Sequence, residues 1–391
     1  MRRQNPLSYQ SSKSVFEHFE LNKRVSFLRR IPDFQQLHLT VPAKAKTLRF
    51  DWNSVTINDF THTIEIVSLP GEVSHRFGVA PLESYGTHRL AENTHPANNI
   101  MVATPGNLLI YLRNQDSYLA SPGQRSYTYY TVKNAAGEKV RSILLPNGIL
   151  PSDATRKLIE KFFVGRKNSI VGTLAIDVVH GFLRVPTGFC VNPHHLKIAG
   201  HACATLNSIM PILDKESFPL RSLEINIRND TDPVFNNEVA VNADKICINH
   251  QYLLREIFTG MLPKLKNREI LLTDELNWRD ISTHLNEWMS TPQPIGRKVT
   301  MMSETPQYQM TSLRLLLKNR AKFCTIPNKE CARSNFALTV QVTDVSELNI
   351  YIYKAPNYEE EVAKGCSGKR WALIWEIMEL GTAVIMENVV I

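Results

Sequence analysis

The amino-acid sequence predicts a mixed α/β fold, because the spacing of its apolar residues changes three times along the chain. The spacing is helical near the N-terminus, then alternates with a period of two. Next it switches between strand-like and helix-like runs, and finally it alternates again. We therefore predict four segments: a helical segment over residues 1–45, a β-rich segment over 46–150, a strand–helix array over 151–305 and a C-terminal β cap over 306–391.

The helical segment is predicted from a single apolar face. Val15, Phe16 and Phe19 have the spacing that places three side chains on one side of a helix. A second short helix is expected over residues 22–30. It should end before Pro32, because the residue before a proline is pushed out of the α region. So small a unit cannot bury its own apolar surface, and we expect it to dock on the rest of the chain or on another protein.

Two-residue alternation begins at Leu37, Leu39 and Val41 and predicts strands from there to about residue 150. Turn residues separate the runs, as at Asn58-Asp59. The polar stretches 86–107 and 113–126 are predicted to be mobile loops. Further strands are expected at residues 48–52, 55–57, 64–66, 108–112 and 127–133.

The strand–helix array has an approximate repeat. Short β-type runs are centred on Leu196, Leu223, Ile246, Ile270 and Val299, at separations of 27, 23, 24 and 29 residues. These separations are close to the period of leucine-rich repeats, so we predict an irregular leucine-rich-repeat-like array of parallel strands with outer helices. A plain α/β layer is the alternative. Helices are expected at residues 153–166, 204–213, 254–261 and 278–288, and none between Leu223 and Ile246.

The last segment is predicted to be an antiparallel β cap. It has one helical pattern at residues 310–317, followed by alternating apolar runs at 338–342, 348–352 and 371–377. Solenoids need such a cap where their stack of repeats ends.

The formal net charge of +8 is concentrated at the N-terminus. The first 50 residues hold ten lysines and arginines against three carboxylates, a balance of +7, which leaves +1 for the other 341 residues. A basic segment that also carries an apolar helix face favours an acidic protein partner. A nucleic acid bound by the same basic segment is the alternative function.

Composition and motifs exclude several classes of protein. A content of 43% hydrophobic and 21% charged residues is that of a globular chain, and no apolar run reaches the roughly 20 residues that span a bilayer. The N-terminus lacks the apolar core of a secretory signal, and the six cysteines lack disulfide-type spacing. We expect a cytoplasmic or nuclear protein. No phosphate-binding loop, nucleophile elbow or metalloprotease motif is present, so we expect neither an enzyme nor a cofactor.

One cluster of potential metal ligands stands apart from this pattern: Cys190, His194, His195, His201 and Cys203. Thiolate and imidazole are zinc ligands, but the spacing matches no zinc module. We favour exposed histidines beside a buried cysteine, with zinc and a cysteine–histidine hydrolase as alternatives.

Several motifs resemble a large nematode-expanded family of F-box-related proteins that carry a nematode-specific domain of unknown function. The resemblance extends over most of the chain. It rests on Pro6-Leu7-Ser8-Tyr9, Val15, Phe19, Leu21-Asn22-Lys23-Arg24, Ile31-Pro32, residues 142–146, 218–227 and 262–265, and the segment 371–383.

The resemblance implies that the helical segment is F-box-like and docks on an acidic Skp-type adaptor of a cullin ubiquitin ligase, while the rest of the chain holds an unknown substrate protein. The sequence departs from the F-box pattern in its inverted Pro6-Leu7 opening and in a missing third helix, because a β-type run follows Pro32. A helical cap folded onto the repeat body is the structural alternative. The residues expected to contact the adaptor are Pro6, Leu7, Val15, Phe16, Phe19, Lys23, Arg24, Arg29 and Arg30.

Overall fold

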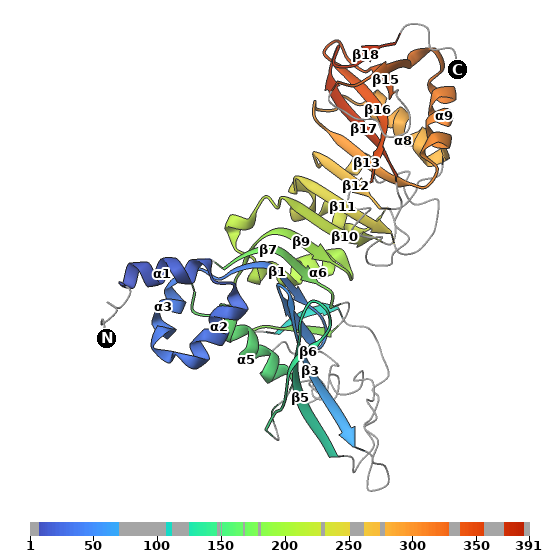
Figure 1. Cartoon of the computed structure of the whole chain (residues 1–391). Helices are drawn as coiled ribbons and strands as arrows, with labels where there is room; N and C mark the ends of the chain where they lie inside the picture. The colour runs from blue at the N-terminus through green and yellow to red at the C-terminus, as the bar shows by residue number, and fades with distance from the viewer. Residues whose placement is uncertain are drawn as a thin grey trace. The chain divides into compact units, whose positions relative to one another are not determined.

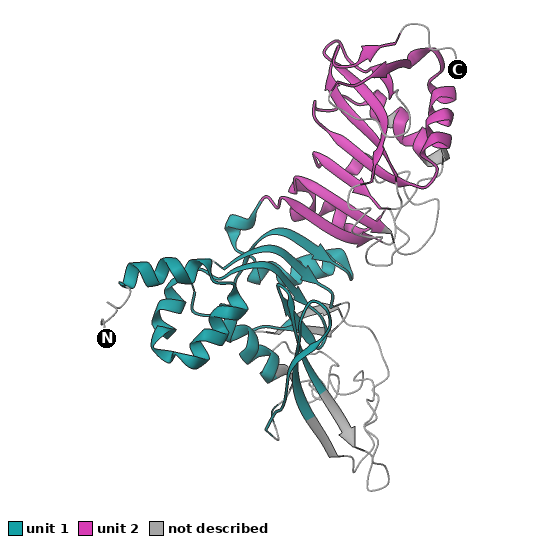
Figure 2. Ribbon diagram, viewed as in Figure 1, with its two compact units in different colours: residues 1–218 teal, residues 219–391 magenta. Residues whose placement is uncertain are grey.

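The chain forms two units, residues 1–218 and residues 219–391, shown in different colours in Figure 2. A computed structural model describes residues 8–69, 107–111, 125–146, 149, 151–166, 169–178, 181–227, 231–250, 262–273, 278–327, 337–355 and 371–386. Both units mix helices with strands, so the predicted mixed α/β class is confirmed. The division into two units neither supports nor excludes the four predicted segments, which stay a prediction.

Unit 1 begins with helices and continues with strands (Figure 1). Its helices are α1 (Tyr9–His18), α2 (Leu21–Arg30), α3 (Gln35–Thr40), α5 (Pro151–Phe163) and α6 (Ala202–Ile209), with 3-10 turns η1 (Pro32–Phe34), η4 (Met210–Ile212) and η5 (Lys215–Ser217). Its strands are β1 (Lys44–Phe50), β2 (Ser54–Ile57), β3 (Phe60–Leu69), β4 (Asn107–Tyr111), β5 (Arg125–Lys133), β6 (Lys139–Leu144), β7 (Ile170–Ile176), β8 (Gly181–Arg184) and β9 (Asn192–Ile198).

The main sheet of unit 1 has the strand order β9-β7-β1-β2-β3-β5-β6. Strands β9, β7 and β1 are parallel, and the ladder aligns the buried side chains Leu48, Leu174 and Leu196. From β1 to β6 each neighbouring pair is antiparallel. Strands β4 and β8 pair separately. The strands predicted at residues 48–52, 55–57, 64–66, 108–112 and 127–133 are present wherever the chain is described.

Unit 2 combines a parallel and an antiparallel part. The parallel strands are β10 (Ser222–Ile227), β11 (Lys245–His250), β12 (Glu269–Leu272) and β13 (Lys298–Ser303). Next to β13 follow the antiparallel strands β17 (Trp371–Glu379), β16 (Ser346–Lys354), β15 (Ala337–Gln341), β14 (Lys322–Thr325) and β18 (Val384–Ile385).

The helices of unit 2 lie between these strands in the chain. They are α7 (Glu238–Asn242), α8 (Trp278–Ser290) and α9 (Pro306–Leu317), with 3-10 turns η6 (Pro233–Asn236), η8 (Leu262–Lys264) and η9 (Lys318–Arg320). Figure 1 shows α8 and α9 together on one side of the strands.

The register of the parallel strands explains the spacing seen in the sequence. Leu223, Ile246, Ile270 and Val299 are direct partners across β10 to β13, and each is at most 1% exposed. One strand every 23 to 29 residues thus adds one buried rung to the same apolar row, as the sequence predicted. The antiparallel strands continue the sheet beyond β13.

One predicted strand is wrong. Leu37, Leu39 and Val41 belong to α3 and its C-terminal end rather than to a strand. Leu37 and Val41 are also four residues apart, and both are buried in the same cluster as Phe16. The buried contacts of Leu37 and Val41 on one side of a short helix outweigh the two-residue alternation that predicted a strand. The same observation also corrects the expectation that a third N-terminal helix is missing, because α3 is that helix.

A second correction concerns the connection between β10 and β11. No helix was expected there, yet η6 and α7 occupy it. The side chain of Asn237 begins α7 by accepting a hydrogen bond from the backbone N–H of Val239 at 3.0 Å. With five residues, α7 is too short to show a helical period in the sequence.

Some expectations fall outside the described residues. The helix expected at 254–261 lies there, and so do nearly all residues of the loops expected at 86–107 and 113–126. Among the residues that the structure does describe, no helix is long and apolar enough to cross a membrane.

A close approach of β1 and β7 gives a testable prediction. A Cβ atom on Gly172 would lie 2.6 Å from the backbone carbonyl oxygen of Lys46, closer than packed atoms allow. We expect Gly172→Ala to push the two strands apart and lower the free energy of unfolding by about 1–3 kcal/mol. Chemical denaturation measures this, with Lys44→Ala at an exposed position of β1 as the control. Equal stabilities of the two variants would contradict the close approach.

Candidate protein-interaction site

The first three helices of unit 1 fold around phenylalanine rings. Phe16 of α1 is 2% exposed, and its ring centroid lies 5.8 Å from that of Phe19, 5.5 Å from Phe27 and 5.4 Å from Phe34. Stacked and edge-to-face pairs at these distances are favourable. Because the rings come from α1, α2 and η1 and the residue that follows α1, they hold these elements together as one unit.

Part of this ring cluster reaches the surface. Phe19 is 36% exposed, and Val15, one helical turn before it, is 41% exposed, while Phe27 and Phe34 are half-buried. Ring contacts join Phe19 to Phe27 at 6.1 Å and Phe27 to Phe34 at 5.5 Å. We call these four side chains, Val15, Phe19, Phe27 and Phe34, the aromatic face.

Exposed cations border the aromatic face along α2. Lys23 lies four residues before Phe27 and Arg30 three residues after it, so all three share one side of the helix. Both Lys23 and Arg30 are exposed. An apolar centre with a charged rim is the usual anatomy of a protein–protein interface.

A partly buried polar network fixes the opposite side of α2 on the sheet. The Glu20 carboxylate caps α2 by accepting from the backbone N–H of Lys23 at 3.1 Å. Its other oxygen accepts from the side-chain amides of Asn22 at 2.8 Å and Asn58 at 2.5 Å. Asn22 also donates to the backbone carbonyl of Ile57 at 2.9 Å. The first turn of α2 is thus bonded to the turn between β2 and β3.

Asn58 extends this network into β1. Its backbone has a positive φ of 54°, a conformation that asparagine tolerates in tight turns. In that position its side-chain oxygen accepts from the backbone N–H groups of Lys46 at 2.7 Å and Thr47 at 3.3 Å. One side chain therefore joins α2, the β2–β3 turn and β1.

His62 of β3 completes the network in the interior. Its Nε2 lies 3.2 Å from the side-chain oxygen of Asn22 and its Nδ1 2.8 Å from the Tyr130 hydroxyl. Because the Asn22 oxygen can only accept, Nε2 carries the proton and Nδ1 accepts from Tyr130. Burial is the main cause that lowers the pKa of His62 to about 4, with the Arg29 charge as a second cause. The imidazole is therefore neutral in the folded chain.

Arg24 holds α1 to α2. The side chain is 1% exposed, and it donates to the backbone carbonyls of Glu17 at 3.1 Å, Phe19 at 2.8 Å and Pro42 at 2.9 Å. The carbonyls of Glu17 and Phe19 lie at the C-terminal end of α1, where a helix leaves acceptors unpaired and favours a cation. Burial lowers the pKa of Arg24, and the carboxylates of Glu17 and Glu20 oppose this.

Arg29 belongs to the sheet side of α2. It follows Asn22 by seven residues, almost two full turns, and so lies on the same side of the helix. After burial, its charge is the cause that lowers the pKa of Lys161 in α5 and of His62 in β3. Arg29 therefore lies apart from the aromatic face, although it is exposed.

A second buried histidine lies between α3 and α5. His38 is 1% exposed, and a guanidinium nitrogen of Arg166 contacts its ring. Burial, followed by the charges of Arg166, Arg24 and Lys161, lowers the pKa of His38 to about 3. His38 is thus also neutral in the folded chain.

The structure brings together only some of the residues predicted to contact a partner. Val15, Phe19, Lys23 and Arg30 lie together at the surface, and Arg29 lies on another side. Phe16 and Arg24 are buried. The prediction that these two side chains contact a partner directly is therefore corrected: they support the surface residues from inside. Pro6 and Leu7 lie outside the described residues.

Sequence reasoning missed two members of the aromatic face, Phe27 and Phe34. The spacing of Phe27, Ile31 and Phe34, at intervals of four and three residues, was the available signal. It extends beyond the end of α2 into η1, where no helix was expected.

The cysteine and histidine cluster is spread over β9, α6 and the residues before them. Cys190 and His195 are exposed, and Cys203 is half-buried, so the expected buried cysteine is not found. No group of three or more potential ligands capable of holding a metal ion occurs in the described part of the chain. Partial burial and the Asp214 charge raise the pKa of Cys190, which disfavours the thiolate that a nucleophile needs.

Comparison with known proteins identifies one region of similarity. Residues 151–305 match a family described as a domain of unknown function, DUF3557. No curated protein and no solved structure matches the chain. The part of the predicted resemblance that concerns a domain of unknown function is therefore confirmed over residues 151–305. That region begins after the helical segment, so the F-box part stays a prediction.

The role of Arg24 can be tested by comparison with its neighbour. Arg24→Gln removes the guanidinium that donates to three backbone carbonyl groups, and we expect the free energy of unfolding of the helical segment to fall by about 3 kcal/mol. Lys23→Gln makes the same change of charge at an exposed position and should alter this free energy of unfolding by less than about 0.5 kcal/mol. Hydrogen exchange of the amides in α1 and α2 reports both changes. Similar exchange rates in the two variants would contradict the role of Arg24.

His62 predicts a pH dependence of stability. Its folded pKa of about 4 lies below the value near 6.5 of an unfolded histidine, so the unfolded chain binds the extra proton between these pH values. The free energy of unfolding should therefore fall as the pH decreases from about 6.5 to about 4, by about 1.4 kcal/mol per pH unit. The contribution of His62 is fully present above this window.

Urea denaturation of the wild type and of His62→Gln across this pH window isolates the contribution. The variant should lose stability less steeply with falling pH, and the slope that remains reflects other buried histidines such as His38 and His284. An identical slope in both proteins would show that His62 is not held neutral by the fold.

Proposed function

We propose that the chain is a non-enzymatic recognition protein whose helical segment binds an acidic Skp-type adaptor of a cullin ubiquitin ligase. The observation that supports this proposal is the aromatic face, an exposed apolar surface bordered by Lys23 and Arg30 on helices that are rigidly held from behind. The chain acts by proximity: one part holds the ligase, another holds the substrate protein, and no bond is broken by the chain itself.

The aromatic face has the composition of an interface hot spot. Aromatic residues and arginine contribute most of the binding energy in protein interfaces, and the face offers three phenylalanine rings beside Arg30. The rings already contact one another in the free chain, so little side-chain freedom is lost on binding. The cations at the rim favour an acidic partner and raise the association rate.

The third helix supports the F-box-like interpretation. The resemblance implies three helices in an F-box, and α3 supplies the one that the sequence analysis expected to be missing. The other departure from the F-box pattern, the inverted Pro6-Leu7 opening, lies outside the described residues. The partly buried network from Glu20 to Tyr130 also supports the alternative of a helical cap on the sheet. The roles of helical cap and adaptor-binding segment are compatible, because docking on the sheet uses one side of α2 and leaves the other side exposed.

The body of the chain is proposed to hold the substrate. Strands β10 to β13 repeat every 23 to 29 residues and pair in parallel, which favours the leucine-rich-repeat-like interpretation. Repeat arrays bind partners through surface side chains that vary without a fixed motif.

Adaptor binding is tested by two substitutions in the aromatic face. We expect the full chain to bind a purified acidic Skp-type adaptor, and Val15→Asp with Phe19→Asp to weaken binding about 30-fold or more, because two apolar contacts become like charges facing an acidic surface. Isothermal titration calorimetry measures the affinity. The matched control is Gln10→Asp, which adds a carboxylate at an exposed position of α1 away from the aromatic face.

Two outcomes would contradict this proposal. One is the absence of binding by the wild-type chain, and the other is equal binding by the double variant and the control. Retention of the chain on RNA or duplex DNA, lost in Lys23→Glu with Arg30→Glu but kept in the aromatic-face variant, would favour the nucleic-acid alternative. Its affinity would then fall with salt, by a log–log slope of about 0.9 for each duplex phosphate neutralised.

A further inference from the structure

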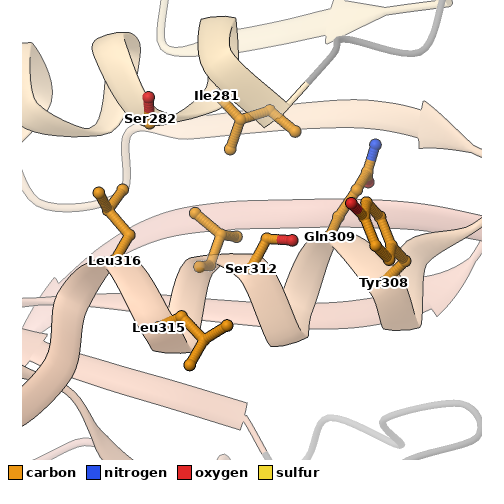
Figure 3. Close-up of a pocket in the computed structure, with 8 residues that line it drawn as sticks. Ile281, Ser282, Tyr308, Gln309, Ser312, Leu315 and Leu316 are labelled. Atoms are coloured by element: carbon orange, nitrogen blue, oxygen red, sulfur yellow. The ribbon is translucent and has the colours of Figure 1, made fainter.

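A groove between α8 and α9 in unit 2 forms a second candidate binding surface. It has a volume of about 370 Å³ and is lined by Ile281, Ser282, Tyr308, Gln309, Ser312, Leu313, Leu315 and Leu316. Figure 3 shows Ile281 of α8 and Leu316 of α9 on facing helices across this space. We call this surface the α8–α9 groove.

The apolar residues of the α8–α9 groove continue onto the outer side of α9. Tyr308 is 65% exposed, Leu315 69% and Leu316 39%. Tyr308 and Leu315 are seven residues apart, so they lie on one side of the helix about 10 Å apart along its axis. An isolated exposed apolar residue needs no explanation, but a row of them beside a groove marks an interaction site.

The chemistry of the lining favours a polypeptide over a reacting small molecule. Apart from the Tyr308 phenol, the lining contains no ionisable side chain, and its polar groups are hydroxyls and one amide. Such a surface can accept large aliphatic side chains, but it offers no acid, base or nucleophile. Helical peptides bind apolar grooves in this way, with anchors spaced three, four and seven residues apart.

Charges on the α9 side of the groove favour an acidic partner. From residue 303 to residue 327, the chain has four cations, Arg314, Lys318, Arg320 and Lys322, against the single carboxylate of Glu304. All four cations are exposed, and they lie in α9 or follow it. A partner with acidic residues beside its apolar anchors is complementary to this arrangement. A second copy that docked through the same surface would instead bring the same cations to the groove.

We propose that the α8–α9 groove binds a short amphipathic segment of another protein, one that combines large aliphatic side chains with aspartate or glutamate. Under the proposed function, the protein that carries this segment is the substrate. In this respect the inference rests on the proposed function. Peptide binding itself does not require the adaptor, because the groove belongs to unit 2 and the aromatic face to unit 1.

A phage-displayed library of random peptides, panned on the purified full chain, tests the proposal without the adaptor. We expect the recovered peptides to be enriched in leucine, isoleucine or phenylalanine together with aspartate and glutamate. Synthetic copies of these peptides should bind in a fluorescence anisotropy assay. Recovery of no peptides, or of peptides rich in lysine and arginine, would overturn the proposal.

Variants then locate the binding site. Leu315→Asn with Leu316→Asn removes apolar anchors, and Lys318→Glu with Arg320→Glu reverses the charge, so each pair should weaken peptide binding about ten-fold or more. Val345→Asn removes an apolar side chain that is 68% exposed elsewhere in unit 2 and serves as the matched control. Equal binding by all variants would place the site elsewhere and overturn the proposal. A self-association in sedimentation velocity that is lost in the leucine variant would show that a second copy occupies the groove, and would also overturn it.

Discussion

The orientation of α2 on the sheet of unit 1 depends on one partly buried polar network, which runs from Glu20 through Asn22 and Asn58 to His62 and Tyr130. A buried polar group that loses its partner costs about 1–3 kcal/mol, so each member of the network requires the others in place. A rotation of α2 about its axis would break several of these bonds together. The network therefore determines which side of α2 faces outward, and so it determines which side chains of α2 belong to the aromatic face.

The cations of the helical segment have divided roles, although the sequence presents them as one basic region. Arg24 points inward to three backbone carbonyls, and Arg29 lies near α5 and β3, while Lys23 and Arg30 border the aromatic face. The charge balance of +7 in the first 50 residues thus overstates the charge available to a partner. The aromatic face, with the exposed cations Lys23 and Arg30 at its rim, is the feature on which the proposed acidic protein partner rests. In the motif Leu21-Asn22-Lys23-Arg24, three residues are buried and only Lys23 is exposed.

The features predicted from the sequence are those that depend on local spacing. The strands around Leu223, Ile246, Ile270 and Val299 follow from apolar runs between turns, and the register of their buried partners agrees with the predicted repeat. The helix α3 was missed because Leu37, Leu39 and Val41 satisfy the alternation of a strand as well as the spacing of a helix. The network was beyond sequence reasoning for a different reason: His62 pairs with residues 40 and 68 positions away, and only the fold brings them together. The same holds for Arg24, whose burial cannot be inferred from its neighbours Lys23 and Val25.

Hydrogen–deuterium exchange of the full chain, with and without an acidic Skp-type adaptor, tests the central claim most directly. In the free chain, the amides of α2 should exchange slowly, because the network and Arg24 hold that helix. With the adaptor present, additional protection should appear in α1, α2 and η1, around Val15, Phe19, Phe27 and Phe34, and not in unit 2. Fast exchange of α2 in the free chain, or protection confined to unit 2, would contradict the account.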